Sequence, residues 1–179
     1  MNHLDTLEAW LASLPDDIQC FRAIAADESI PAGARRVAAG IINYLFKSID
    51  LIPDGIDDIG TIDDVMTLRL GAALIKAEEV ERSQPEAGRT LRHLAEEVSV
   101  VREILGTDLH ERFARYTSTL ATVSSRGRSA QDIVENSQKL HEMSAEVGSF
   151  CTGYIIPQLE KSERTLIKLR AFLDTRLPR

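Results

Sequence analysis

The side chains best suited to chemistry in this sequence are six aspartates that fall within fifteen residues, with no basic residue among them. Carboxylates crowded onto a short loop are ligands that hard divalent cations such as Mg²⁺, Ca²⁺ and Mn²⁺ prefer. A cation held there could also activate water to hydrolyse a phosphorylated small molecule. One hypothesis is therefore a divalent-metal site, or a metal-dependent hydrolase, with ligands drawn from Asp50, Asp54, Asp57, Asp58, Asp63 and Asp64.

The same aspartates also suit structural roles that need no ligand. The helix dipole and the free N–H groups favour an acid in the first turn of a helix, and an aspartate in a turn can bond the backbone two residues on. An aspartate can also pair with an arginine. These roles fit Asp63 and Asp64 at a helix start, Asp57 or Asp58 in a turn, and Asp50 or Asp54 beside Arg35, Arg36 or Arg69. A partner surface is the third possible use of the cluster.

The backbone that carries the aspartates is expected to be an ordered connection between two helices. Pro53, Gly55 and Gly60 exclude one continuous helix. The segment is not an EF-hand, because Ile52 and Thr61 occupy places where a calcium loop needs oxygen-rich ligands. The apolar side chains between the aspartates are expected to point inward; they are Leu51, Ile52, Ile56, Ile59 and Ile62.

Other catalytic and cofactor motifs are absent from the sequence. It contains neither of the two common glycine-rich phosphate loops and no G-x-S-x-G around a nucleophilic serine. The histidines do not form H-E-x-x-H or Glu-x-x-His patterns, so we expect each to be an ordinary helix residue; they are His3, His93, His110 and His141. No catalytic residue and no resident cofactor is assigned.

The charge of the chain is concentrated in the same segment. The formal net charge is −7, and the aspartate cluster supplies −6 of it, so the rest of the chain is almost balanced. An acidic chain argues against nucleic-acid binding, which depends on Lys and Arg displacing counterions. Cys20 and Cys151 form no metal or redox spacing, which suits a reducing cytoplasm. We expect a cytoplasmic protein without a signal peptide, and we do not expect it to bind membranes.

Hydrophobic periodicity predicts an all-α fold, because apolar residues recur at helical spacing and period-two alternation is scarce. Pro15 either ends the first helix or begins the second. Capping boxes are expected at Thr61 with Asp64 and at Asp108 with Glu111, and Ser129 is expected to cap a later helix. The expected helices run through residues 4–14, 18–25, 31–46, 65–77, 91–105, 109–123, 133–154 and 159–173. The helix that contains residues 65–77 is expected to end near Ser83-Gln84-Pro85, and Pro85 fits the start of the next helix.

We expect two parts packed as one unit. Residues 1–84 form a compact helical part that includes the aspartate-rich loop, residues 48–64, and a nearly all-apolar central helix that follows it. Residues 85–179 form long antiparallel helices with a narrow apolar seam and charged flanks, arranged as a hairpin or bundle. Such seams pack on each other or on a second copy of the chain.

The aspartate segment and the helices beside it resemble the YkvA-like family, a domain of unknown function. The match rests on Ile49-Asp50-Leu51-Ile52-Pro53-Asp54, on Gly60 and on Asp63-Asp64, within about residues 30–77. Ser48 and Asp57 stand where the family usually has proline. The resemblance implies a small helical domain and brings no established reaction, substrate or catalytic residue, and the helices after Pro85 lie outside it.

Three functions remain as hypotheses. The first is a non-catalytic cytoplasmic interaction or scaffold protein that binds a protein partner, or itself, through the helices after Pro85. The second is the divalent-metal protein or hydrolase centred on the aspartates. The third, a peripheral membrane protein, comes from the family resemblance alone; the acidic N-terminal helix with Trp10 disagrees with it.

Overall fold

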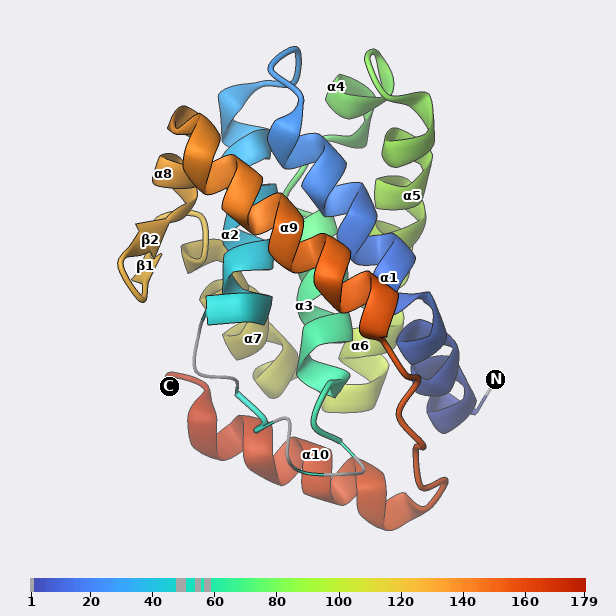
Figure 1. Cartoon of the computed structure of the whole chain (residues 1–179). Coiled ribbons are helices and arrows are strands. Elements are labelled where there is room, and N and C mark those ends of the chain that lie inside the picture. Colours follow the sequence, from blue (N-terminus) through green and yellow to red (C-terminus); the bar gives the residue numbers. More distant parts are fainter. Residues whose placement is uncertain (1, 48–50, 54–55, 57–58) are drawn as a thin grey trace.

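The computed structural model describes residues 2–47, 51–53, 56 and 59–179. The chain folds as a compact all-α structure, as the sequence predicts, with one small hairpin (Figure 1). The elements are α1 (His3–Ala26), α2 (Ala32–Lys47), α3 (Ile62–Ala72), α4 (Ala77–Glu81), α5 (Pro85–Glu96), α6 (Val98–Leu105), α7 (Thr107–Thr119), β1 (Ser124–Ser125), β2 (Arg128–Ser129), α8 (Ala130–Glu135), α9 (Ser137–Gly153) and α10 (Glu163–Arg176).

Helix α3 lies at the centre of the fold. Every residue from Ile62 to Ala72 is buried, which agrees with the prediction of a helix that is apolar almost all round. Helices α1, α2, α5, α6 and α7 all contact α3. The helix is shorter than expected, because the amides of Leu74 and Ile75 bond carbonyls three residues back instead of four, which tightens and ends it.

Helix α1 continues through Pro15, so the prediction of a helix end or restart there is wrong. Proline has no N–H and therefore leaves the carbonyl of Leu11 without its helical partner. The hydroxyl of Tyr154, which follows α9, donates a hydrogen bond of 2.8 Å to that carbonyl. A contact from a distant part of the chain thus satisfies the carbonyl that the proline exposes.

Two of the predicted caps are wrong and one is confirmed. Thr61 makes no side-chain capping bond at the start of α3. Helix α7 begins at Thr107 after Gly106, whose φ of 80° suits glycine, and has no side-chain cap from Asp108. Ser129 caps α8 in a reciprocal box with Asp132.

The helices after Pro85 are shorter than predicted and pack around the first three helices. The expected helix over residues 91–105 divides at Glu97 into α5 and α6, and the expected helix over residues 133–154 divides at Asn136 into α8 and α9. Helix α9 lies against α1, and α8 lies against α2 (Figure 1). Residues 124–129, which lie between two of the expected helices, form the β1–β2 hairpin.

Within the part of the chain that the structure describes, no helix is both long enough and apolar enough to pass through a membrane.

Candidate functional site

Only two of the six predicted metal ligands belong to the described part of the chain. Asp63 and Asp64 lie in the first turn of α3, as predicted, and both are buried. Asp50, Asp54, Asp57 and Asp58 lie outside the described residues. Among the described residues, no group of three or more His, Cys, Asp or Glu side chains could hold a metal ion. The cation site therefore stays a prediction.

Asp63 fastens the segment that precedes α3. Its Oδ2 atom accepts a hydrogen bond of 2.6 Å from the Tyr44 hydroxyl and one of 3.2 Å from the backbone N–H of Ile52. The Tyr44 oxygen in turn accepts a bond of 3.3 Å from the N–H of Leu51. Burial raises the pKa of Tyr44 well above its usual value, and the charges of Asp63 and Asp64 add to this, so the hydroxyl remains a donor.

The apolar side chains of this segment point inward, as predicted. Leu51, Ile52, Ile59 and Ile62 are buried, and Ile56 packs against the core. The described part of the aspartate-rich loop is therefore held by its apolar residues and by Asp63. This agrees with the structural interpretation of Asp63.

Arg69 forms a buried ionic cluster with residues that are distant in the sequence. Its guanidinium donates to Glu97 at 2.9 Å and to Asp17 at 3.4 Å. Asp50 and Asp54, for which Arg69 is a predicted partner, lie outside the described residues. It also lies 4.1 Å from the centre of the Trp10 ring, and the Trp10 indole donates to Glu97 at 2.8 Å. The cluster joins α1, α3 and the α5–α6 junction.

This cluster is structural rather than catalytic. Arg69 is 1% exposed and Asp17 is 5% exposed, so a substrate has no access to them. Burial raises the pKa of Asp17 despite the nearby Arg69 charge. One sequence signal pointed here, because Arg69 is the only charged residue in the middle of an otherwise apolar helix. Its partners Glu97 and Asp17 lie 28 and 52 residues away in the sequence. No local sequence pattern therefore identifies them as partners of Arg69.

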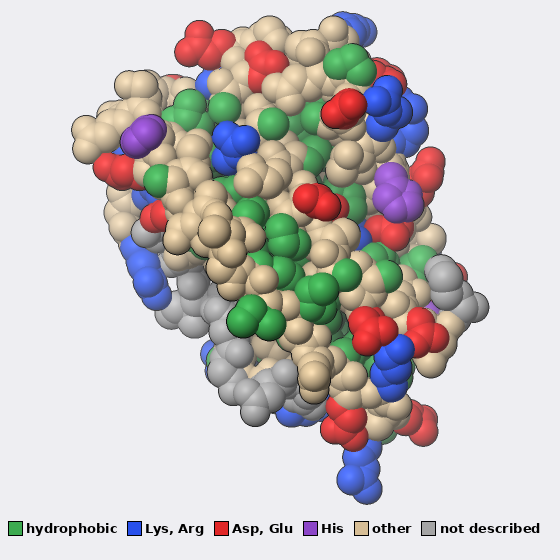
Figure 2. All heavy atoms as spheres, turned by 45° about the vertical axis from the view of Figure 1, so that its right-hand side comes forward, with side chains coloured by type: hydrophobic (Ala, Val, Ile, Leu, Met, Phe, Trp, Pro, Cys, Tyr) green, Lys and Arg blue, Asp and Glu red, His purple; other side chains and the backbone are tan. Residues whose placement is uncertain are grey.

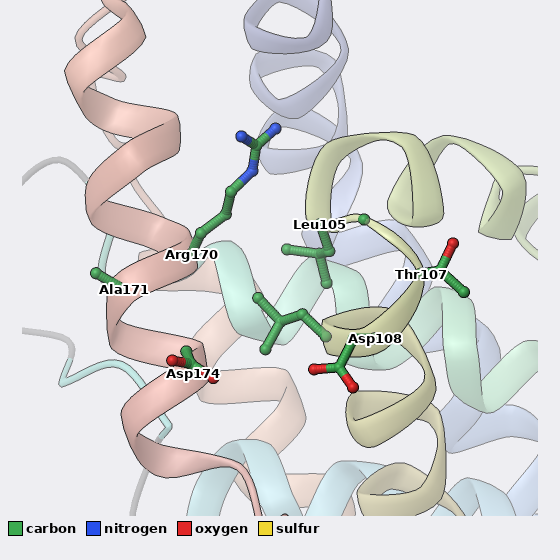
Figure 3. A pocket seen from close by; sticks show the side chains of 8 residues that line it. Leu105, Thr107, Asp108, Arg170, Ala171 and Asp174 are labelled. Atoms are coloured by element: carbon green, nitrogen blue, oxygen red, sulfur yellow. The ribbon is translucent and has the colours of Figure 1, made fainter.

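A hollow of about 450 Å³ lies where α10 meets the α6–α7 turn. Asp108 on α7 and Asp174 on α10 lie on its opposite walls (Figure 3). Both carboxylates pair with Arg112, which also donates to the backbone carbonyls of Asp174, Leu177 and Pro178. The Arg112 contacts beside this hollow hold α10 on the helical bundle. They give the two aspartates a structural role and not a catalytic one.

One face of the molecule combines exposed apolar side chains with a lack of charge. Residues 147–159 contain no charged side chain, although 27% of the chain is charged. Ile155 is 86% exposed and Ile156 is 50% exposed. We define the α9 face as the exposed residues of this region and the preceding turn: Ala145, Ser149, Thr152, Gly153, Ile155, Ile156 and Gln158. Hydrophobic side chains gather in the middle of the surface in Figure 2, with charged side chains mostly around them.

Aromatic side chains support this face from below. The rings of Phe46 and Phe150 meet edge-on with centres 5.5 Å apart, and Phe150 lies 5.1 Å from Tyr154. A cavity of about 260 Å³ lies beside them, lined by Ile18, Leu45, Phe46, Thr61, Asp64 and Phe150. Burial raises the pKa of Tyr154 to about 12, with Asp64 adding to the shift, so its hydroxyl stays a donor to Leu11. The aromatic contacts and this bond fix the α9 face in place.

Sequence reasoning missed the α9 face because it followed the apolar residues of the buried seam. The available signal was the uncharged run at residues 147–159 together with the adjacent Ile155 and Ile156. The helical pattern predicted a helix over residues 133–154. The helix ends at Gly153 instead, and the two isoleucines follow it in a non-helical segment.

Comparisons with known proteins give no relative for this chain: no family model, no curated protein and no solved structure matches it. The YkvA-like resemblance is neither supported nor contradicted by them.

Proposed function

We propose that this chain is a non-catalytic helical interaction protein whose partner surface lies in the helices after Pro85. The observation that carries the proposal is the pair Ile155 and Ile156, exposed next to each other on an uncharged face. A single exposed apolar side chain is common on protein surfaces. Adjacent exposed isoleucines on a surface without charge are typical of the centre of a protein interface, where charged residues are depleted.

The distribution of exposed apolar side chains supports the C-terminal location. Among the described residues, the large hydrophobic side chains with high exposure are Leu74, Val123, Ile155, Ile156 and Ile167. All except Leu74 follow Pro85. The polar groups that could suggest chemistry have structural partners instead, since Arg69, Asp17 and Glu97 bond one another inside the fold.

Photo-crosslinking tests this proposal. A photo-reactive amino acid placed at Ile155 should give a discrete covalent adduct with another protein chain when the full-length protein is irradiated in cells. The same amino acid at Leu74, which is 45% exposed on the N-terminal part, is the matched control and should give none. No adduct at Ile155, or equal adducts at both positions, would contradict the proposal.

A further inference from the structure

The cavity beside Phe46 and Phe150, which we call the aromatic cavity, lies where four helices meet. Its described lining comes from α1, α2, the start of α3 and α9, and consists of Ile18, Leu45, Phe46, Thr61, Asp64 and Phe150. Spaces between the helices of a bundle are a common place for small-molecule sites. Such sites usually combine apolar walls with a small number of polar groups. The aromatic cavity has this composition.

The volume of the aromatic cavity limits the size of its ligand. A cavity of about 150 Å³ is large enough for a benzene ring, and pockets for drug-sized molecules begin at about 300 Å³. The aromatic cavity measures about 260 Å³. It therefore has room for one ring with a short substituent. The rings of Phe46 and Phe150 meet edge-on and offer the apolar surface against which such a ring can pack.

The polar wall of the cavity is made by two residues whose spacing predicts a different task. A threonine followed three residues later by an acid is typical of a capping box, in which each side chain bonds the backbone of the other. Thr61 makes no side-chain capping bond at the start of α3. Thr61 and Asp64 both line the aromatic cavity instead. Natural proteins depart from such local rules chiefly at functional sites.

The carboxylate of Asp64 determines the kind of ligand. Among the described lining residues it is the one charged side chain, and it is 9% exposed. It lies in the first turn of α3, where the helix dipole favours its ionised form. A carboxylate accepts several hydrogen bonds, so Asp64 can bind a ligand while it keeps the bonds it makes within the chain. An ammonium group is the matching donor, because charge-assisted hydrogen bonds are the stronger ones.

We propose that the aromatic cavity binds a small organic cation, whose hydrocarbon body packs against Phe46 and Phe150 and whose ammonium group donates to Asp64. The Thr61 hydroxyl supplies a second acceptor for the same group. A divalent metal ion is a poorer occupant, because the apolar side chains that form most of the described lining cannot replace its oxygen ligands. This inference goes beyond the proposed interaction function and does not depend on the α9 face.

A series of three ligands of nearly equal shape tests the charge requirement on the full-length protein at neutral pH. Benzylammonium, benzyl alcohol and benzoate are each titrated by calorimetry. Benzylammonium should bind about tenfold more tightly than benzyl alcohol, because its bond to Asp64 is charge-assisted. Benzoate should not bind, since it brings a second negative charge to Asp64. Equal affinities for the cation and the alcohol, or no binding of the cation, would overturn the proposal.

Methyl NMR of labelled isoleucines locates the ligand. Ile18 lines the aromatic cavity, so its methyl signal should shift in the field of the benzylammonium ring. Ile167 is 58% exposed on α10 and should not shift. Shifts at Ile155 and Ile156 without one at Ile18 would place the ligand on the α9 face and would overturn the site.

Two variants test the assigned roles. Asp64→Asn should weaken benzylammonium about tenfold and leave benzyl alcohol unchanged. Asp108→Asn is the matched control: it removes an exposed acid from the first turn of α7, outside the cavity, and should leave both affinities unchanged. Thr61→Phe should abolish binding of both ligands, because the larger side chain fills the cavity from a half-buried position that makes no capping bond.

The variants remain informative if one of them is unstable. The affinity ratio of two ligands on one protein does not depend on how much of that protein is folded, and Thr61→Phe tests the cavity without removing Asp64. A preference for the cation that persists in Asp64→Asn would overturn the role of this carboxylate. Unchanged binding in Thr61→Phe would overturn the aromatic cavity as the site.

Discussion

The hydroxyl of Tyr154 donates a hydrogen bond to the carbonyl of Leu11, the group that Pro15 leaves without a helical partner. This contact joins α1 to the segment after α9, which are 143 residues apart in the sequence. It allows a proline inside a long buried helix without an orphaned carbonyl. It also fixes Tyr154 immediately before Ile155 and Ile156, and so links the stability of α1 to the geometry of the α9 face.

Replacing Tyr154 by Phe should lower the free energy of unfolding by about 1–3 kcal/mol, because the Leu11 carbonyl loses its donor inside the protein. In a Pro15→Ala background the same replacement should cost much less, since alanine at this position donates its own N–H to Leu11. Urea unfolding of the four proteins at one concentration measures the coupling between the two sites. Purely additive effects would contradict the explanation of how α1 tolerates Pro15.

Arg69→Met should destabilise the fold by about 3 kcal/mol, because it leaves the Asp17 and Glu97 carboxylates near each other without their shared cation. Arg89→Met is the matched control. Arg89 is exposed and lies 4.0 Å from Glu86, a surface pair of small energetic value. Chemical denaturation of both variants measures the difference, and equal losses would show that the buried cluster contributes no more than a surface pair.

Asp17→Asn should change how stability depends on pH. Burial raises the pKa of Asp17 in the folded chain, so the folded state binds this proton more tightly than the unfolded state does. Ionised Asp17 therefore lowers stability as the pH rises from the ordinary carboxyl value of 3.8 through its raised folded pKa. Asparagine removes this loss.

The difference in unfolding free energy between Asp17→Asn and the unaltered chain should therefore move in favour of the variant as the pH increases over this window. The difference between the two proteins isolates Asp17 from other carboxyl groups. Asp27 and Asp132, whose pKa values are lowered by hydrogen bonds, act in the opposite direction. A difference that moves in favour of the unaltered chain with rising pH would contradict the assigned direction.

The divalent-cation hypothesis predicts a rise in melting temperature when Mg²⁺, Ca²⁺ or Mn²⁺ is added, because a ligand that binds only the folded chain stabilises it. Asp54→Asn with Asp58→Asn should abolish that rise and the heat of binding in titration calorimetry. Asp63→Asn should lower stability even without a cation, since Asp63 accepts bonds from Tyr44 and Ile52. An unchanged melting temperature together with no heat of binding would reject the cation site.

Local sequence patterns predicted the parts of the fold that depend on neighbouring residues. The apolar run around Met66 indicated a central helix, and Ser129 indicated a cap, because both depend on residues within one or two turns. The cap expected at Thr61 does not form, although threonine followed three residues later by an acid is typical of a helix start. Asp63, which follows it closely, bonds Tyr44 and Ile52 in the tertiary structure.

The candidate site was harder to predict than the fold. The aspartates attracted attention because they are chemically versatile and close in sequence, yet Asp63 has a structural role. The α9 face is made of residue types that are common on protein surfaces and belong to no motif, such as Ala145 and Ser149. Its significance depends on exposure, which is set by what the rest of the chain covers.

The sequence by itself determined the helical class, the buried position of α3 and the inward direction of the apolar residues before it. Hydrophobic burial at a repeating spacing is a local property that favours one side of each helix. Only the tertiary structure decided which carboxylates neutralise Arg69, how Pro15 fits inside α1 and why Ile155 and Ile156 stay exposed. Each of these depends on contacts between segments far apart in the chain, and residue spacing carries no information about which distant segments will meet.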